Sequence, residues 1–331
     1  MPPHIVLTGQ HPHLDLDSFG IGRLDCTRLD CSAGTPMAFA ERAAFEAQAA
    51  IVGSELVLVQ GDTSSALGGA LGADRIGIPV GHVEAGLRTH DDRNPWPEEG
   101  FRKRIDELSS VLFAPTEYSA ANLRRERVRG AVHVTGNTAI DAALSMKVPH
   151  EPKSLGIFRL LVTCHRRESW GEGLIGVAGA LRQIAESGSV SVDFVLHPNP
   201  QVAMRFRSLL AETAGIALHR PCTHREMLAR MQSADLILSD SGGMQEEAPI
   251  LGVPLLVMRD CTERPEAIVS GNIAMVGRHR GRIVNEVLRL LGDPSALDAM
   301  RRPALPYGDG RAAERIAEIV AGSLGVAAAA A

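Results

Sequence analysis

The sequence predicts an α/β protein with two doubly wound parallel sheets, each covered by helices on both faces. Short apolar runs rich in Val, Ile and Leu alternate with longer stretches of helical composition. The alternation starts again after residues 147–156, which contain Pro149 and Pro152 and are typical of a linker. The chain has 331 residues, enough for two cores, since domains have roughly 100–200 residues.

The first half alternates predicted strands with predicted helices. We expect strands at residues 4–8, 56–60, 77–83, 111–115 and 131–135. We expect helices at residues 36–51, 64–73, 97–108, 119–127 and 139–146. Elements that alternate in this way form parallel sheets, because each helix carries the chain back to the start of the next strand.

The second half repeats the pattern. We expect strands at residues 158–163, 192–196, 236–239 and 254–257. We expect helices at residues 174–185, 201–214, 225–231, 243–251 and 282–291. The last residues, 326–331, are mostly alanine, and we expect them to fray.

Composition limits the possible partners and compartments. The net charge is −5 and no long basic run occurs, which argues against nucleic acid as a partner. No apolar stretch reaches the roughly 20 residues needed to span a bilayer, and no signal peptide is evident. The five cysteines form no C-x-x-C pair, which favours a reduced, cytoplasmic protein. No metal-binding motif or G-x-G-x-x-G motif occurs, so we expect neither a metal nor a dinucleotide cofactor.

Three acids of the first half lie where predicted strands end or helices begin. Asp62 follows the strand 56–60, Glu84 follows the strand 77–83, and Glu98 follows Pro97. Ligands of open α/β sheets bind at the carboxyl ends of the strands, so these acids are candidates for acid–base chemistry. Each also has a structural interpretation: Asp62 as a helix cap, Glu84 as the partner of Arg88, and Glu98 as part of an ordinary helix start.

Two segments of the second half are candidates for binding an anion. His165 and Arg166 follow the strand 158–163, where cationic side chains suit an anionic ligand. Ser241, Gly242 and Gly243 open a helix directly after the strand 236–239, so free backbone N–H groups can meet a phosphate there. Glu247 lies one turn further on, within reach of ribose hydroxyls. The structural interpretations are a solvated charge cluster and a tight strand–helix turn.

Taken together, these segments resemble the non-hydrolysing UDP-N-acetylglucosamine 2-epimerases. The matching stretches occur in order at residues 8–11, 60–63, 81–89, 97–99, 135–138, 165–168, 240–249, 258–260, 262–266 and 306–310. The resemblance implies the GT-B fold, in which two Rossmann-like domains hold the ligand in the cleft between them. It also implies a homodimer and a role in polysaccharide biosynthesis.

The resemblance also implies where the domains begin and end. It places an N-terminal Rossmann-like domain at residues 1–147 and a UDP-binding Rossmann-like domain at residues 148–309. A helix at residues 310–325 would cross back to the first domain, and a disordered Ala-rich tail would follow at residues 326–331.

The implied reaction interconverts UDP-N-acetylglucosamine and UDP-N-acetylmannosamine. A base removes the C2 proton while UDP leaves C1, and UDP then adds back to bound 2-acetamidoglucal as a proton reaches the other face of C2. By motif position, the residues that match the family's catalytic set are Asp62, Glu84, Glu98 and His165. Those that match its UDP-binding set are Ser241, Gly242, Gly243 and Glu247. The sequence does not assign a particular acid to either face of C2.

Some family members bind a second UDP-N-acetylglucosamine as an activator. The residues that match that site here are Gln10, Arg166 and His197. A second glutamine expected near Gln10 is replaced by His13. The sequence therefore matches the family's activator site only in part.

The chain departs from the family at its start. Family members open with a strand, a Gly-Thr-Arg-Pro-Glu loop and a helix that this sequence lacks, and the first strand is central in the doubly wound order. Without it, we expect two strand edges inside the sheet to lack a partner. Two explanations are a true start further upstream and a degenerate paralogue. The competing functions are a hydrolysing epimerase, a GT-B glycosyltransferase and a non-catalytic UDP-sugar-binding protein.

Overall fold

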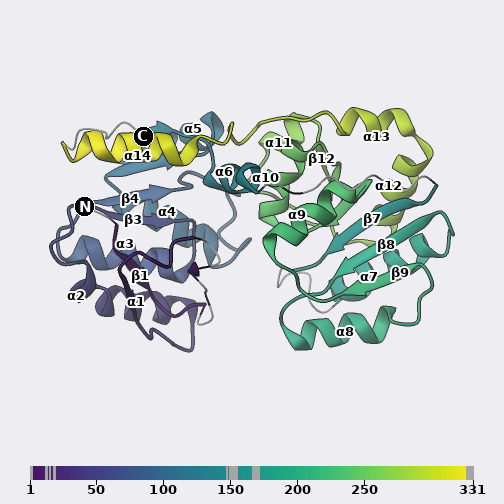
Figure 1. Cartoon of the computed structure of the whole chain (residues 1–331), viewed down its shortest axis with the longest axis horizontal. Helices are drawn as coiled ribbons and strands as arrows, with labels where there is room; N and C mark the ends of the chain where they lie inside the picture. The colour runs from purple at the N-terminus through teal and green to yellow at the C-terminus, as the bar shows by residue number, and fades with distance from the viewer. Residues whose placement is uncertain are drawn as a thin grey trace. The chain divides into compact units, whose positions relative to one another are not determined.

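Contacts within the chain divide the molecule into two α/β units. The computed structural model describes residues 3–11, 14, 16–17, 20–146, 148, 156–165 and 172–325. The first unit combines Met1–Asn137 with Arg311–Ala331, and the second comprises Thr138–Gly310. The first unit therefore contains both the purple start of the chain and the yellow helix α14 (Ala312–Ser323) in Figure 1.

The first unit holds two separate parallel sheets. Strand β1 (Ile5–Leu7) pairs with β2 (Cys26–Arg28), and a second sheet has the order β3 (Val57–Gln60), β4 (Val80–Val83), β5 (Val111–Ala114) and β6 (Ala131–Val134). The helices of this unit are α1 (Pro36–Glu46), α2 (Gln48–Ile51), α3 (Ser64–Arg75), α4 (Glu98–Leu108), α5 (Glu117–Glu126) and α14 (Ala312–Ser323). Every strand pair is parallel, as the alternation of strands and helices predicts.

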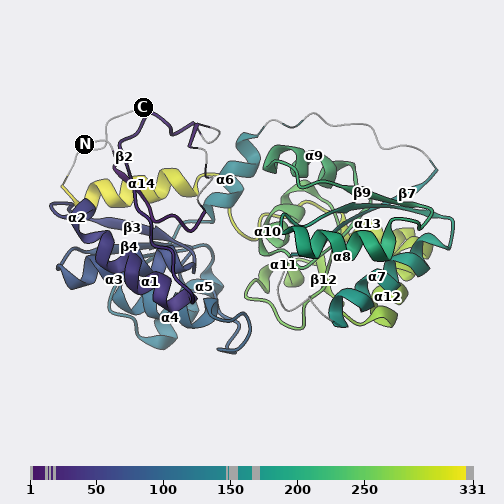
Figure 2. The ribbon, with the colours of Figure 1, turned by 90° about the horizontal axis from the view of Figure 1, so that it is seen from below.

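Helices α1 and α3 form one closely packed layer in the first unit. A Cβ atom on Gly68 would lie 2.5 Å from the Cβ of Ala43, and one on Gly72 would lie 2.8 Å from the carbonyl oxygen of Ala44. The glycines of α3 therefore let the two helix backbones approach closely, and the two helices lie side by side in both ribbon views (Figures 1 and 2). Val6 of β1 and Val57 of β3 pack on the same core cluster as these helices.

Strands β1 and β3 border a cavity rather than pairing with each other. Within the described residues, the ladder partner of β1 is β2 and that of β3 is β4. A cavity of about 380 Å³ is lined by residues of β1, β3, α2 and α3. The two strand edges expected from the sequence are therefore present, and they face a common space.

The second unit is built around one six-stranded parallel sheet. Its strand order is β12 (Ile273–Met275), β11 (Leu255–Val257), β10 (Leu236–Ser239), β7 (Phe158–Thr163), β8 (Val190–Val195) and β9 (Ile216–His219). Its helices are α6 (Thr138–Ser145), α7 (Glu172–Ala185), α8 (Pro200–Leu210), α9 (His224–Ser233), α10 (Gly242–Leu251), α11 (Glu266–Val269), α12 (Arg280–Gly292) and α13 (Pro294–Met300). Two apolar clusters contain buried residues from the sheet and from these helices.

The strand order of the second unit is that of a Rossmann fold. The chain runs outward through β7, β8 and β9, returns to β10 beside β7, and continues through β11 to β12. The order reverses between β7 and β10, and ligands of open α/β sheets bind at the carboxyl ends of the strands at such a reversal. His165 follows β7 and Ser241 follows β10, so both predicted binding segments lie there.

Several short elements were missing from the sequence-based prediction. Strands β2, β9 and β12 have only three or four residues each. The predicted helix 36–51 is two helices, α1 and α2, with Ala47 as the residue between them. Helix α6, which the sequence places in the first domain, packs on α10 of the second unit.

Candidate active site

Asp62 and Glu84 follow neighbouring parallel strands of the first unit. Gln60 of β3 is in register with Val83 of β4, so the two acids leave the sheet at the same edge. Gly61 has φ +69°, a left-handed conformation that suits glycine and turns the chain at the end of β3. A Cβ atom on Gly61 would lie 3.4 Å from Glu84 Oε2, so the Glu84 carboxylate lies close to the turn that carries Asp62.

The backbone of Glu84 adopts a left-handed conformation. Its φ is +71°. This conformation is unfavourable for any residue that carries a Cβ atom, whereas glycine adopts it without strain. Residues held in such conformations cluster at functional sites, where the surrounding structure enforces them. The conformation of Glu84 therefore favours a functional interpretation of this acid.

Glu98 and Glu99 begin helix α4 but have different environments. Glu99 is fully buried, and its carboxylate accepts hydrogen bonds from the backbone N–H groups of Thr89 and His90. Glu98 Oε2 is also buried, yet it has no hydrogen-bond partner among the described residues. A buried carboxylate oxygen without a partner is costly and calls for an explanation such as a ligand. Glu99 is thus a structural residue, and Glu98 remains a candidate for chemistry.

Arg102 of α4 holds the Asp62 side chain, and the sequence analysis did not identify it. Its Nε donates to Asp62 Oδ2 at 3.1 Å, and its Nη2 donates to the same oxygen. Its Nη1 donates to Glu99 Oε2 at 3.0 Å. The sequence spacing could have indicated Arg102, because residues 98, 102 and 106 lie on one face of a helix.

A buried charge network lies next to these acids. His82 Nδ1 lies 2.6 Å from Asp106 Oδ1, and His82 Nε2 lies 2.9 Å from the carbonyl oxygen of Gly61. Arg88 Nη2 lies 2.7 Å from Asp106 Oδ2 and also pairs with Glu126. Burial works against ionisation of Asp106, but the neighbouring His82 and Arg88 keep the pKa of its carboxyl below the usual value. Asp106 is therefore ionised in this network.

His165 and His197 come together in the second unit. Their ring centroids are 5.0 Å apart, and the backbone N–H of His165 donates to Asp240 Oδ1 at 2.8 Å. Burial lowers the pKa of the His165 imidazole, Asp240 opposes that shift, and His197 adds to it. Burial likewise lowers the pKa of His197. His165 is thus neutral at pH 7, the form in which one ring nitrogen accepts a hydrogen bond and the other donates.

The turn at the start of α10 has the features of an anion-binding site. Ser241 caps the helix with its side chain, and Gly242 and Gly243 form the first turn. A Cβ atom on Gly242 would lie 2.9 Å from Arg264 Nη1, so a guanidinium, held by ion pairs to Glu246 and Glu263, lies beside the helix N-terminus. Free N–H groups, the helix dipole and a cation together favour a phosphate.

Glu247 lies one turn into α10 and is held by a histidine. It is 7% exposed, and His224 Nε2 lies 2.6 Å from its Oε1. The hydrogen bond to Glu247 raises the pKa of the His224 imidazole, against the opposing effect of burial. The sequence analysis did not assign His224 a role, since nothing local links it to a residue 23 positions away.

The predicted activator residues lie in different parts of the chain, and one of them is outside the described residues. Gln10 Oε1 accepts hydrogen bonds from the backbone N–H and the hydroxyl of Ser65, at 2.9 and 2.7 Å, in the first turn of α3. His197 lies beside His165, as described above. Arg166 and His13 lie outside the described residues.

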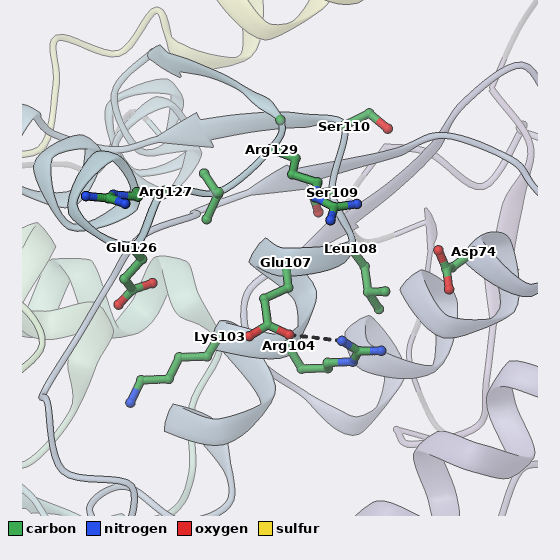
Figure 3. Close-up of a pocket in the computed structure, with 12 residues that line it drawn as sticks. Asp74, Lys103, Arg104, Glu107, Leu108, Ser109, Ser110, Glu126, Arg127 and Arg129 are labelled. Atoms are coloured by element: carbon green, nitrogen blue, oxygen red, sulfur yellow. Dashed lines mark hydrogen bonds and ion pairs between the residues drawn. The ribbon is translucent and has the colours of Figure 1, made fainter.

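A large cavity occurs elsewhere in the first unit. It has a volume of about 1040 Å³, and charged side chains such as Lys103, Arg104 and Glu107 line it (Figure 3). Ser110 and Gly130, which also line it, directly precede β5 and β6, so it lies at the amino ends of these strands. Ligands of open α/β sheets bind at the opposite, carboxyl ends, so we do not assign the chemistry to this cavity.

The described part of the chain lacks two kinds of feature. No cluster of three or more His, Cys, Asp or Glu side chains could hold a metal ion there. No helix there is both long and apolar enough to cross a membrane.

The fold and the residues described above define an α/β enzyme of the GT-B type with a candidate phosphate-binding turn. A sequence model of the family described as UDP-N-acetylglucosamine 2-epimerase matches residues 1–321. The chain therefore belongs to the UDP-N-acetylglucosamine 2-epimerase family.

Individual relatives agree with this family. UDP-N-acetylglucosamine 2-epimerase of Escherichia coli K12 is 44% identical over 280 residues, which cover 80% of this chain and 74% of that enzyme. The crystal structure of UDP-GlcNAc 2-epimerase from Neisseria meningitidis bound to UDP-GlcNAc has a TM-score of 0.86 and 34% identity, covering 93% of this chain and 87% of that one. The S. aureus MnaA–UDP co-structure has a TM-score of 0.85 and 29% identity, covering 100% of this chain and 99% of that one.

Proposed function

We propose that this chain interconverts UDP-N-acetylglucosamine and UDP-N-acetylmannosamine without releasing free sugar. The observation that carries the proposal is that Asp62 and Glu84 follow neighbouring strands at one sheet edge, while helix α4, which begins at Glu98, is bonded to Asp62 through Arg102. Glu98 has a buried oxygen without a hydrogen-bond partner among the described residues. Family membership and the relative that was crystallised with UDP-GlcNAc support this substrate.

The nucleotide half of the substrate would use the second unit. The N–H groups of Gly242 and Gly243, with the nearby Arg264 guanidinium, favour a diphosphate, which is the leaving group of the reaction. Glu247, oriented by His224, would accept hydrogen bonds from the ribose hydroxyls. His165 would assist at the diphosphate as a neutral imidazole, because its pKa is lowered by burial.

The sugar half of the substrate would react at the carboxylates. One carboxylate takes the proton from C2, the electron pair forms the C1–C2 double bond, and the C1–O bond breaks as UDP departs with its electrons. A UDP oxygen then attacks C1 of bound 2-acetamidoglucal, and a carboxylic acid returns a proton to the opposite face of C2. Two faces require two proton carriers or one mobile carrier, which suits a site with several acids.

The first test follows the C2 proton. The purified chain is incubated with UDP-N-acetylglucosamine in deuterated water and followed by proton NMR. We expect UDP-N-acetylmannosamine with deuterium at C2 and no free sugar. Accumulation of free UDP and N-acetylmannosamine would instead identify a hydrolysing epimerase, and UDP binding without exchange at C2 would contradict the proposed catalysis.

Two further properties are proposed with this function. The first is activation by a second UDP-N-acetylglucosamine, for which Gln10, Arg166 and His197 are the candidate residues. Adding small amounts of UDP-N-acetylglucosamine should then accelerate the reverse reaction from UDP-N-acetylmannosamine. The second is a homodimer, which sedimentation velocity would detect as twice the 35.3 kDa mass of one chain.

A further inference from the structure

Four buried charged side chains lie together beside the start of helix α10. They are two arginines and two glutamates, each at most 8% exposed: Arg259, Arg264, Glu246 and Glu263. Their formal charges cancel, and buried charges are tolerated when they are paired in this way. A neutral cluster adds little net attraction for an anion. Its contribution to anion binding therefore depends on where its guanidinium groups are held.

The guanidinium of Arg264 is held by acids from two different segments. Its Nε donates to Glu246 Oε1 of α10 at 2.5 Å, and its Nη1 donates to Glu263 Oε1. Glu263 is itself held by Arg259, whose Nη2 donates to Glu263 Oε2 at 2.8 Å. Because a guanidinium is rigid and planar, hydrogen bonds from two of its nitrogens fix both its position and its orientation.

The backbone of Arg264 is held as well. Its N–H donates to Thr262 Oγ1 at 3.1 Å, and the hydroxyl of Tyr307 donates to its carbonyl oxygen at 2.9 Å. Thr262 Oγ1 donates to Oε1 of the fully buried Gln245, whose Nε2 donates to the carbonyl oxygen of Ser241 at 3.3 Å. Thr262 and Gln245 thus connect the segment that carries Arg264 to the residue that caps α10.

Gly242 lets this guanidinium lie directly against the first turn of α10. A Cβ atom on Gly242 would lie 2.9 Å from Nη1, 3.2 Å from Cζ and 3.5 Å from Nη2 of Arg264. These similar distances show that the face of the group, rather than a single corner, lies against the glycine. The glycine and the two glutamates together therefore determine where the guanidinium lies relative to the N–H groups that begin the helix.

We propose that Glu246 and Glu263 are positioning residues that act through Arg264 on the diphosphate of UDP; this role rests on the proposed function, in which the start of α10 binds that group. A guanidinium that is already fixed loses little side-chain entropy when the anion binds, which favours affinity. It also needs no rearrangement when negative charge develops on the leaving group as the C1–O bond breaks.

The negative charge of the glutamates has the opposite effect on binding. If that charge acted directly on the bound diphosphate, neutralising a glutamate would tighten UDP binding, because like charges repel. Glu246→Gln removes the charge but keeps a carbonyl oxygen as the acceptor for Arg264 Nε. Glu246→Asp keeps the charge but shortens the side chain by one methylene, so the guanidinium loses its anchor. The two variants therefore separate position from charge.

The test is calorimetric titration of the full chain and its variants with UDP. We expect Glu246→Asp to weaken UDP binding about tenfold and Glu246→Gln to stay within about threefold of the wild type. The control is Asp235→Ala, which removes a 3.0 Å hydrogen bond to Arg301 at the opposite end of β10 and should leave UDP binding unchanged. Thermal unfolding confirms that each variant is folded before binding is measured.

A double-mutant cycle shows whether Glu246 acts through Arg264. We expect Arg264→Gln to weaken UDP binding by itself, and Glu246→Asp to cause no further loss in that background. The same pattern is expected for Glu263→Asp, since its carboxylate holds Nη1 of the same guanidinium.

Three results would overturn the proposal. They are tighter UDP binding by Glu246→Gln, unchanged binding by Glu246→Asp, and losses that add in the double-mutant cycle. Failure of the wild type to bind UDP would instead contradict the proposed nucleotide site, and the role of the glutamates with it. The two failures are therefore distinguishable, because the first three results require a wild type that binds UDP.

Discussion

At the scale of single residues, His82 is held between two groups that can only accept hydrogen bonds. One is the carbonyl oxygen of Gly61, and the other is the carboxylate of Asp106, which is ionised because its pKa is lowered. His82 thus links helix α4 to the turn at the end of β3. Its bond to Gly61 fixes the peptide that precedes Asp62, which makes His82 a positioning residue for that acid.

Replacing His82 tests this positioning. We expect His82→Gln to lower kcat about 10- to 100-fold with little change in KM, because small displacements of reacting groups cost rate more than binding. The matched control is His219→Gln, which removes a similar 2.6 Å bond to Asp193 in the other unit and should leave kcat unchanged. Steady-state kinetics of both variants measure this, and an unchanged kcat in His82→Gln would refute the positioning role.

Glu98 and Glu99 form a second matched pair. We expect Glu98→Gln to lower kcat about a hundred- to ten-thousand-fold while the melting temperature stays nearly the same, because Glu98 Oε2 makes no hydrogen bond among the described residues. We expect Glu99→Gln to lower the melting temperature, because its carboxylate holds two N–H groups and Arg102. Steady-state kinetics and thermal unfolding of both variants check this, and the reverse pattern would contradict the assignment.

At the scale of elements, the first turn of α10 depends on its glycines in different ways. A methyl group at Gly242 would lie 2.9 Å from Arg264 Nη1, whereas one at Gly243 would lie 3.9 Å from the nearest atom, Ser241 Oγ. We expect Gly242→Ala to displace the guanidinium and weaken UDP binding about tenfold, and Gly243→Ala to have a smaller effect. Calorimetric titration with UDP measures both, and equal effects would argue against a role for Arg264 at this turn.

The contact between helices α9 and α10 makes stability depend on pH. His224 of α9 has a raised pKa in the folded protein, because it hydrogen-bonds to Glu247 of α10. Its contribution to stability is complete below the ordinary value of 6.5 and is lost as pH rises through the raised folded value. The stability difference between the wild type and His224→Asn should therefore shrink with rising pH, as urea unfolding at a series of pH values would show.

At the scale of the whole molecule, helix α14 completes the first unit from the far end of the chain. Its Ile316 is buried, and Arg315 Nη1 donates to the carbonyl oxygen of Thr135 at 3.0 Å. We expect Ile316→Ala to destabilise the first unit by about 2 kcal/mol and to leave the second unit unchanged. Hydrogen exchange resolved by segment measures this, with the exposed Glu318→Ala as the control. Equal loss of protection in both units would contradict the division.

The sequence predicted the alternation and the strand ends well, because both are local. Hydrophobic runs identified β3, β4, β7 and β10, and the acids and glycines after them lie at the expected edges. The short strand β9 was missed because four residues, Ile216–His219, carry too little periodicity. The Arg102–Asp62 bond was missed because the two residues are 40 positions apart and only the folded sheet brings them together.

The return of α14 to the first unit has a consequence for how the chain folds during synthesis. Strands β3 to β6 leave the ribosome early, but Arg311 and the residues of α14 follow only after the whole second unit, Thr138–Gly310, has been made. At about 5–20 residues per second this is a delay of roughly 9–35 s. For that time the second unit can fold by itself, while the first exposes the surface that Ile316 later covers. We therefore expect the second unit to complete its fold before the first unit does.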